Sequence, residues 1–305
     1  MWYLPKPTLD TIEWYIDKFL TSIKTDIQNS SIKKSVKEIL LPNKEDDIIK
    51  QLLIAPPEVL YPLNERLEKQ IESKGAKQAT MKKICKVFNY DGRISRSRQL
   101  SYDLAKRIGS RTCVYCNRIY SFTVDEISRP DFDHWMPKEK HPLISMSLYN
   151  LIPSCPICNR SIKLRKEFKY GIHVHPYQHS EMSLAFQYAP LPENMWKLTL
   201  ANGTPAEKKT AELLKIEEIY TPYANNEVKD LLEFAYKNPP DYLRTLYNQV
   251  MKSYGGKINK EQAYRVVFGV EMRPSLYLDR PLSKMKKDVL KQLQNSLGIN
   301  IIDFD

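Results

Sequence analysis

Glycine is scarce in this chain, with 9 among 305 residues, whereas lysine, leucine and glutamate are abundant. This balance favours helix over sheet. No run of roughly eighteen apolar residues occurs, which excludes an ordinary membrane-spanning helix. The first residues also lack a basic segment followed by an apolar one, so no secretory signal is expected. We therefore expect a cytoplasmic, mainly helical protein that is not held in a membrane.

Cysteine is also rare, and its placement is specific. Four of the 5 cysteines form two Cys-x-x-Cys pairs, Cys113 with Cys116 and Cys155 with Cys158. Two such pairs supply the four thiolates of a tetrahedral zinc site. Thiolates at all four positions leave none for water, so the predicted Zn²⁺ is structural. Cys85 is left over and is expected to face the core.

The segment between the two pairs carries polar residues with chemical potential. Residues 117–154 are too many for a compact zinc finger, and they contain Asp131, Asp133, His134 and Asn150. A lone histidine is usually a packed or surface residue. However, its imidazole titrates near neutral pH and can take a proton from water. Asp133 offers hard carboxylate oxygens of the kind that Mg²⁺ or Mn²⁺ prefers.

Together these pieces carry a resemblance. Cys-x-x-Cys, then Asp-His-x-x-Pro, then Asn-Leu-x-Pro-x-Cys-x-x-Cys-Asn, over residues 111–166, resembles the HNH endonucleases. The resemblance implies a ββα-metal module, in which a β-hairpin and a helix hold one catalytic metal ion beside the zinc site. The longer pattern is also similar to the HNH nucleases that bacteria keep beside ATPase genes for defence against phage, which implies an ATPase partner.

The resemblance also implies roles for single residues. His134 becomes the general base, Asp133 and Asn159 become ligands of the catalytic Mg²⁺ or Mn²⁺, and Asn150 fixes the loop and orients the base. The simpler alternatives are that Asn159 caps its helix and that Asn150 is an ordinary turn residue. Asp131 is either a second acid near the metal or a turn residue. Neighbours on a regular strand point to opposite faces, so Asp133 and His134 can aim at one point only from a strand end or a distorted turn.

The charge of the chain points to nucleic acid. The formal net charge is +11, and a basic protein is biased towards polyanions. Residues 74–118 hold twelve basic side chains against two acidic ones, a net of +10. A solvated helix face is the alternative to a phosphate-binding surface. The predicted nucleic-acid contacts, with DNA favoured over RNA, are Arg93, Arg96, Arg98, Arg111, Arg118, Arg160, Lys163 and Lys166.

These patterns predict an α+β fold that is mostly α. We expect a helical region over 1–108, an HNH module with its zinc site over 109–180, and a mainly helical region over 181–305, with the flanking helices packed onto the module as one body. Strands are expected over 118–124 and 132–134 as one hairpin, and later over 171–178, 183–188 and 195–201. Expected helices include 8–20, 46–54, 61–73, 81–88 and 98–108, then 156–166, 204–219, 227–236, 241–254, 260–268 and 282–293.

Three functions remain open at this level. The first is a metal-dependent endonuclease that cuts DNA in anti-phage defence under the control of a partner. The second is a zinc module that binds nucleic acid without cutting it. The third is an inactive subunit whose flanking regions dock an ATPase. The set Asp133, His134, Asn150 and Asn159 favours the nuclease, because a mere binder does not need it.

Overall fold

The structure is a computed structural model that describes residues 3–42, 47–75, 78–164, 166–178, 182–237, 240–255 and 257–297. Helices form most of the described chain, and two small antiparallel sheets of two strands each lie between and among them. The predicted α+β class with mostly helix is confirmed. Within the described ranges, every helix is too short or too polar to cross a membrane. The predicted region 181–305 ends outside the described residues.

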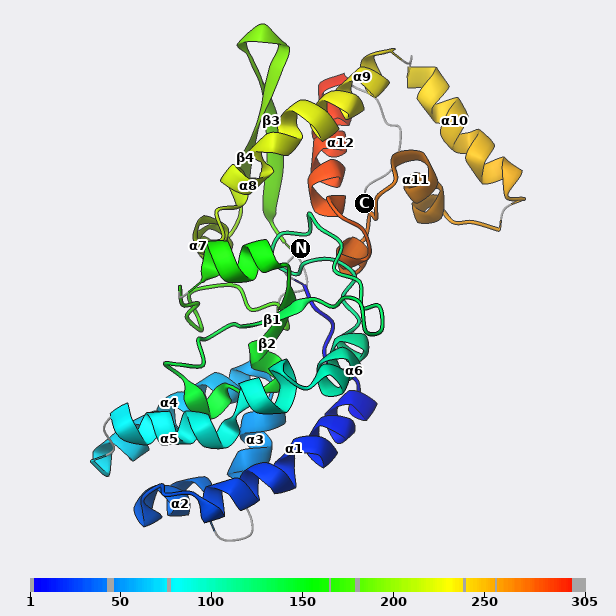
Figure 1. Ribbon diagram of the computed structural model, residues 1–305. Coiled ribbons are helices and arrows are strands. Elements are labelled where there is room, and N and C mark those ends of the chain that lie inside the picture. The colour runs from blue at the N-terminus through cyan, green and yellow to red at the C-terminus, as the bar shows by residue number, and fades with distance from the viewer. Residues whose placement is uncertain are drawn as a thin grey trace.

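The amino-terminal region is a helical layer at the lower end of Figure 1. Thr8 caps its first helix by accepting a hydrogen bond from Thr11 N at 3.2 Å. A four-residue spacing places Tyr15, Phe19, Ile23 and Ile27 on one buried face. The elements are α1 (Leu9–Asn29), α2 (Lys34–Leu40), α3 (Ile48–Ile54), α4 (Pro57–Ser73), α5 (Gln78–Phe88), η1 (Asp91–Ser95) and α6 (Arg98–Ile108).

These helices follow the predicted ones, with differences at their ends. The helix expected over 8–20 continues to Asn29, because its apolar spacing continues. The helix expected over 46–54 begins at Ile48 after Asp47, whose side chain accepts from Lys50 N at 3.0 Å. Asp46 lies outside the described residues.

The centre of the molecule is a short hairpin followed by a helical turn. Strand β1 (Asp131–His134) runs antiparallel to β2 (Leu151–Ser154), with Asp131 opposite Ser154 and His134 opposite Leu151. The π-helical turn η4 (Ile157–Lys163) follows β2, and the 3₁₀ turns η2 (Pro142–Ile144) and η3 (Leu148–Asn150) lie in the connection.

The predicted partner of this hairpin is wrong. Residues 118–124 contribute only the isolated bridges Thr112–Tyr120 and Val124–Ser128. The true partner, β2, is buried at every position. It therefore lacks the alternation of apolar and polar residues by which a half-exposed strand is recognised.

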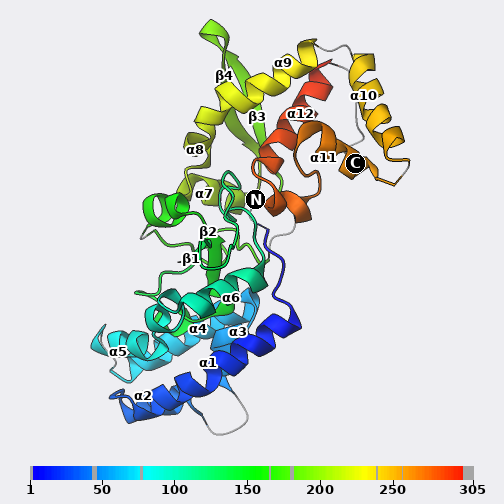
Figure 2. The ribbon, with the colours of Figure 1, turned by 45° about the vertical axis from the view of Figure 1, so that its right-hand side comes forward.

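The carboxy-terminal region is a long hairpin with helices against it, at the upper end of Figures 1 and 2. Strand β3 (Leu184–Leu191) pairs with β4 (Met195–Asn202) around the turn η5 (Pro192–Asn194). The helices are α7 (Pro205–Leu213), α8 (Ile216–Tyr223), η6 (Ala224–Val228), α9 (Lys229–Lys237), α10 (Pro240–Ser253), α11 (Lys260–Phe268), η7 (Pro274–Asp279) and α12 (Ser283–Leu297).

Two predictions for this region are corrected. The helix expected over 204–219 is divided at Lys215, whose φ of 51° belongs to the left-handed region that interrupts a helix. The strand expected over 171–178 is a series of turns. Val174 and Tyr177 are buried there without pairing to another strand, so burial alone produced the strand-like pattern.

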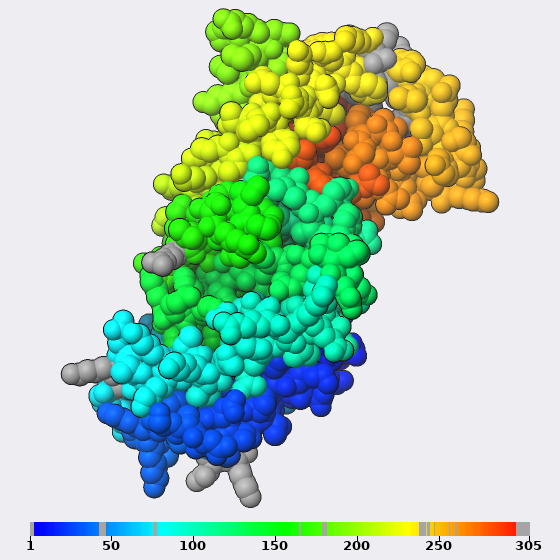
Figure 3. All heavy atoms as spheres, in the orientation of Figure 1, coloured from blue at the N-terminus to red at the C-terminus, as the bar shows by residue number. Residues whose placement is uncertain are grey.

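The centre is bonded to both flanks, and Figure 3 shows the colours following one another in one continuous body. From the amino-terminal side, the Tyr15 hydroxyl donates to Met146 O at 2.8 Å. On the carboxy-terminal side, Asn117 Nδ2 donates to Tyr277 O at 2.7 Å, and Tyr277 belongs to η7. Both bonds are buried, so the hairpin is held between the two helical regions.

Candidate functional site

The four paired cysteines come together as predicted. Their sulfur atoms all lie within 4.8 Å of one another, and Cys116 Sγ is 4.0 Å from Cys155 Sγ. A zinc ion with Zn–S bonds of about 2.3 Å holds its sulfurs about 3.8 Å apart in a tetrahedron. Each of the four residues is at most 1% exposed. The cluster can therefore bind a metal ion such as zinc, and its donor set fits that ion.

Charge around the cluster also suits a bound cation. Hydrogen bonds from the other three cysteines lower the pKa of Cys116, whereas burial raises the pKa of Cys113. Four thiolates this close repel one another unless a cation lies among them. Although burial opposes its charge, the Cys116 thiolate raises the pKa of Arg118. Arg118 is half-buried and donates to Ile219 O at 2.9 Å, and its role as a phosphate contact stays a prediction.

His134 ends β1 and is held in one tautomer. Its Nε2 lies 2.9 Å from Ser145 O, and a carbonyl oxygen can only accept, so Nε2 carries the proton. Burial lowers the pKa of His134 to about 3, which keeps the ring neutral at physiological pH. Nδ1 therefore carries the lone pair of the neutral ring, and no hydrogen bond to Nδ1 is present among the described residues.

Tyr90 covers one side of this imidazole. The two rings meet edge to face, with centroids 4.4 Å apart and planes at 80°. Lys138 lies 5.3 Å from the Tyr90 ring centroid and pairs with Asp91, which follows Tyr90 in the chain. Both His134 and Tyr90 are 8% exposed. Access to His134 is narrow, and no pattern in the sequence predicts that Tyr90 covers it.

Asn150 fixes the loop that presents a carbonyl to His134. Its Nδ2 donates to Met136 O at 3.0 Å and Ile144 O at 3.2 Å, and its Oδ1 accepts from Met136 N at 2.9 Å. Ile144 precedes Ser145, whose carbonyl oxygen accepts the bond from His134. The side chain therefore acts on His134 through the loop and not by direct contact.

A buried chain of hydrogen bonds supports Asn150 from behind. Tyr177 N donates to His175 Nδ1 at 3.3 Å, so the proton of the neutral ring is on Nε2, 2.9 Å from Tyr61 Oη. The Tyr61 hydroxyl is then free to donate to Asn150 Oδ1, at 3.3 Å. His173 has a different partner, because its Nδ1 accepts from Lys169 N at 2.9 Å.

Asp133 does not lie open to a metal ion. Its Oδ2 accepts from the Tyr115 hydroxyl at 2.6 Å and lies 2.8 Å from Lys163 Nζ. Burial raises the pKa of Asp133, and the Lys163 ammonium opposes that shift. Asp133 was predicted as a metal ligand and Lys163 as a phosphate contact. Both stay predictions, and in this structure η4 turns Lys163 inward to pair with the carboxylate.

Asn159 faces a different carboxylate from the predicted one. Its Nδ2 donates to Asp131 Oδ2 at 3.2 Å. Arg160 forms a bidentate ion pair with the same carboxylate. Its Nε donates to Oδ2 at 2.8 Å and its Nη2 donates to Oδ1 at 2.9 Å. Asp133 pairs with Lys163 instead, so the two predicted ligands of Mg²⁺ or Mn²⁺ have different partners in this structure and the predicted donor set does not fit.

The predicted phosphate contacts divide by exposure. Arg93 is committed to the interior of the fold, because Nη1 donates to Ser22 Oγ at 2.7 Å and Nε to Phe88 O at 3.1 Å, and it also pairs with Asp26. Its role as a phosphate contact stays a prediction, as do those of Arg118 and Lys163, and all three side chains are bonded within the fold. The predicted phosphate contacts whose side chains are exposed are Arg96, Arg98, Arg111, Arg160 and Lys166.

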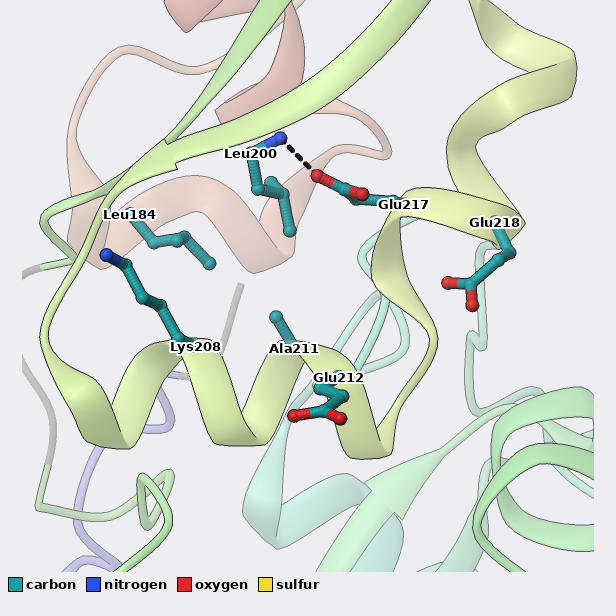
Figure 4. Close-up of a pocket in the computed structure, with 7 residues that line it drawn as sticks. All are labelled: Leu184, Leu200, Lys208, Ala211, Glu212, Glu217 and Glu218. Atoms are coloured by element: carbon teal, nitrogen blue, oxygen red, sulfur yellow. Dashed lines mark hydrogen bonds between the residues drawn. The ribbon is translucent and has the colours of Figure 1, made fainter.

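A separate cavity lies in the carboxy-terminal region. It has a volume of about 260 Å³ and lies between the β3–β4 hairpin and α7 and α8 (Figure 4). Leu184, Leu200 and Ala211 form its apolar wall, and Glu217 Oε1 accepts from Leu200 N at 2.7 Å. That bond satisfies a backbone N–H at the edge of the β3–β4 hairpin, so the Glu217 carboxylate stabilises the hairpin.

Comparison of the chain with protein-family models, curated proteins and solved structures finds no match. Function therefore has to be inferred from the residues of the central hairpin themselves.

Proposed function

We propose that the protein is an HNH-like nuclease that hydrolyses phosphodiester bonds of nucleic acid, DNA in preference to RNA, with His134 as the general base. The supporting observation is the bond from His134 Nε2 to Ser145 O, which leaves Nδ1 as the basic atom. Burial lowers the pKa of His134 to about 3, so Nδ1 is unprotonated at physiological pH. Asn150 is a positioning residue for it.

The proposed step is the attack of one water molecule on the phosphorus atom. A water molecule gives a proton to His134 Nδ1 while its oxygen bonds to phosphorus, and the bond from phosphorus to the leaving oxygen breaks. The leaving oxygen takes a proton from solvent, and the imidazolium returns its own proton to solvent. The exposed residues Arg96, Arg98 and Arg111 are the candidates that attract the phosphate backbone.

The cysteine cluster would hold a structural Zn²⁺ that fixes β2 and η4 beside the base. Zinc would cross-link the two Cys-x-x-Cys pairs there. It would carry no bound water, since four thiolates complete its coordination. We assign no step to Mg²⁺ or Mn²⁺, because Asp133 is occupied by Lys163 and Asn159 faces Asp131.

A second candidate is a zinc module that binds nucleic acid or docks a partner without cutting. Tyr90 over His134 and Lys163 on Asp133 favour it, since both groups of the Asp-His pair are covered. An ATPase partner in phage defence, implied by the resemblance, belongs to either candidate. Under the first, the partner would restrain an otherwise toxic nuclease.

The test is a time course of cleavage with zinc-loaded protein, plasmid DNA and total RNA. We expect the wild type to cut and His134→Ala to lose about 100-fold or more in rate, as removal of a general base does. His173→Ala is the matched control, because His173 lies outside the hairpin. A His134→Ala variant that cuts at the wild-type rate contradicts the proposal. A folded wild type that binds DNA without cutting it, with and without its ATPase partner, supports the second candidate.

A further inference from the structure

Lys163 is the most deeply buried charged side chain beside the proposed base. Its side chain is 1% exposed, and Nζ lies 3.0 Å from Asp133 Oδ1 and 2.8 Å from Oδ2. Nζ also donates to His134 O, the backbone carbonyl of the proposed base. The Phe168 ring centroid lies 5.5 Å from Nζ. The ammonium is therefore enclosed by three oxygen atoms and an aromatic face.

The same oxygen atoms are what a divalent cation would use. Two carboxylate oxygens and a backbone carbonyl are hard donors of the kind that bind Mg²⁺, Mn²⁺ or Ca²⁺. An ion bonded to Asp133 at about 2.1 Å would stand in the space that Lys163 Nζ fills. It would also place a double positive charge beside a buried ammonium, where repulsion is weakly screened. The ammonium and the metal ion therefore exclude each other.

We propose that the Lys163 ammonium is the resident cation of Asp133 and that it keeps divalent metal ions out of the site. Lys163 also connects η4 to the end of β1 through the His134 carbonyl, so one side chain neutralises Asp133 and fixes the backbone of the base. For cutting, the consequence rests on the proposed nuclease function. Hydrolysis by His134 would then proceed without a divalent ion at Asp133.

The test measures metal binding and needs neither nucleic acid nor activity. Zinc-loaded protein is titrated with Mn²⁺, and free Mn²⁺ is followed by its electron paramagnetic resonance signal. Zinc stays on the thiolates, which prefer it to Mn²⁺. The variants are Lys163→Met, which keeps length and removes charge, the double variant Lys163→Met with Asp133→Asn, and Asp131→Asn as control for the neighbouring carboxylate.

We expect the wild type and Asp131→Asn to bind no Mn²⁺ at Asp133, Lys163→Met to gain one Mn²⁺ per chain, and the double variant to lose it. The proposal would be overturned if the wild type bound one Mn²⁺ per chain and the Asp133→Asn variant did not bind it. So would a folded Lys163→Met that gains no site. If circular dichroism shows that Lys163→Met does not fold, the wild type compared with Asp133→Asn still decides. Binding is read without cleavage, so failure of the nuclease proposal leaves this result intact.

Discussion

The two faces of β1 do different work although their residues are neighbours. His134 points to Ser145 and keeps a free lone pair on Nδ1. Asp133 points the other way, where Tyr115 and Lys163 occupy its oxygens. A regular strand alternates its side chains, so an Asp-His pair cannot aim both groups at one atom. The aspartate is paired with a lysine and a tyrosine, whereas the histidine keeps one ring nitrogen without a hydrogen bond among the described residues.

Removing zinc should damage both faces and give the largest effect. The cluster ties the turn after Cys113 to the end of β2 and the start of η4. We expect Cys158→Ser to lower the free energy of unfolding by more than about 4 kcal/mol, as loss of a structural metal does. Metal analysis and denaturant unfolding measure it. Cys85→Ser is the control, because Cys85 lies outside the cluster, and an equal loss in both variants would refute the metal-centred account.

Removing the cation should break the aspartate face alone. Lys163→Ala leaves the Asp133 carboxylate buried without its partner, which costs about 3–5 kcal/mol. Adding Asp133→Asn removes the uncompensated charge and should recover part of that loss. Denaturant unfolding of both variants measures it. Strict additivity of the two changes would show that the ion pair contributes no coupling.

Removing one hydroxyl should loosen the histidine face. Tyr61→Phe deletes the group that connects His175 to Asn150, and leaves buried polar atoms unpaired, at a cost of about 1–3 kcal/mol. Under the proposed nuclease function, cleavage should fall with its pH dependence unchanged, since Asn150 would position His134 and does not titrate. Tyr254→Phe, on an exposed ring, is the control. A shifted pH profile would argue against a positioning role.

Two histidines should give stability opposite dependences on pH. Burial lowers the pKa of His175 to about 3 from 6.5, so its contribution is present above about pH 6.5 and is lost as pH falls towards 3. Although burial opposes it, Glu68 and then Glu167 raise the pKa of His141 above 6.5, so its contribution is present below about pH 6.5 and is lost as pH rises. Each slope is at most about 1.4 kcal/mol per pH unit.

Unfolding measured across pH tests this pair. His175→Gln should flatten the acid side of the stability curve, and His141→Gln should flatten the alkaline side. The same change on the same side in both variants would contradict the assignment.

The smallest effect should separate surface arginines from buried ones. Arg96→Ala should weaken DNA binding a few-fold and reduce its salt dependence by about one counterion. Arg93→Ala should instead lower stability, because its guanidinium holds Ser22 and Phe88 O within the fold. Fluorescence anisotropy at several salt concentrations measures the binding. Equal salt slopes for Arg96→Ala and the wild type would remove Arg96 from the interface.

Local signals predicted much of this architecture. Cys-x-x-Cys spacing located the cluster, and apolar periodicity located most helices, including α1 and α12. The hairpin partner was missed because β2 is buried on both faces and carries no alternation. Burial of Lys163 was missed because lysine is almost always exposed, and only the π-helical turn η4 directs it inward.

The support of the base could not be predicted from spacing. Tyr61 lies 89 residues before Asn150 and 114 before His175, and only the tertiary fold brings α4 against the hairpin. The metal role of Asp133 followed from its motif. The motif does not show that the Lys163 ammonium lies beside this carboxylate.

The most direct test of the two-face account is cleavage of end-labelled DNA in excess EDTA, by protein that retains its zinc. The account predicts that the wild type still cuts, that His134→Ala does not, and that added Mg²⁺ does not restore the variant. Cutting that stops in EDTA, returns with Mg²⁺ and is lost in Asp133→Asn would contradict it, because Asp133 would then hold the catalytic metal.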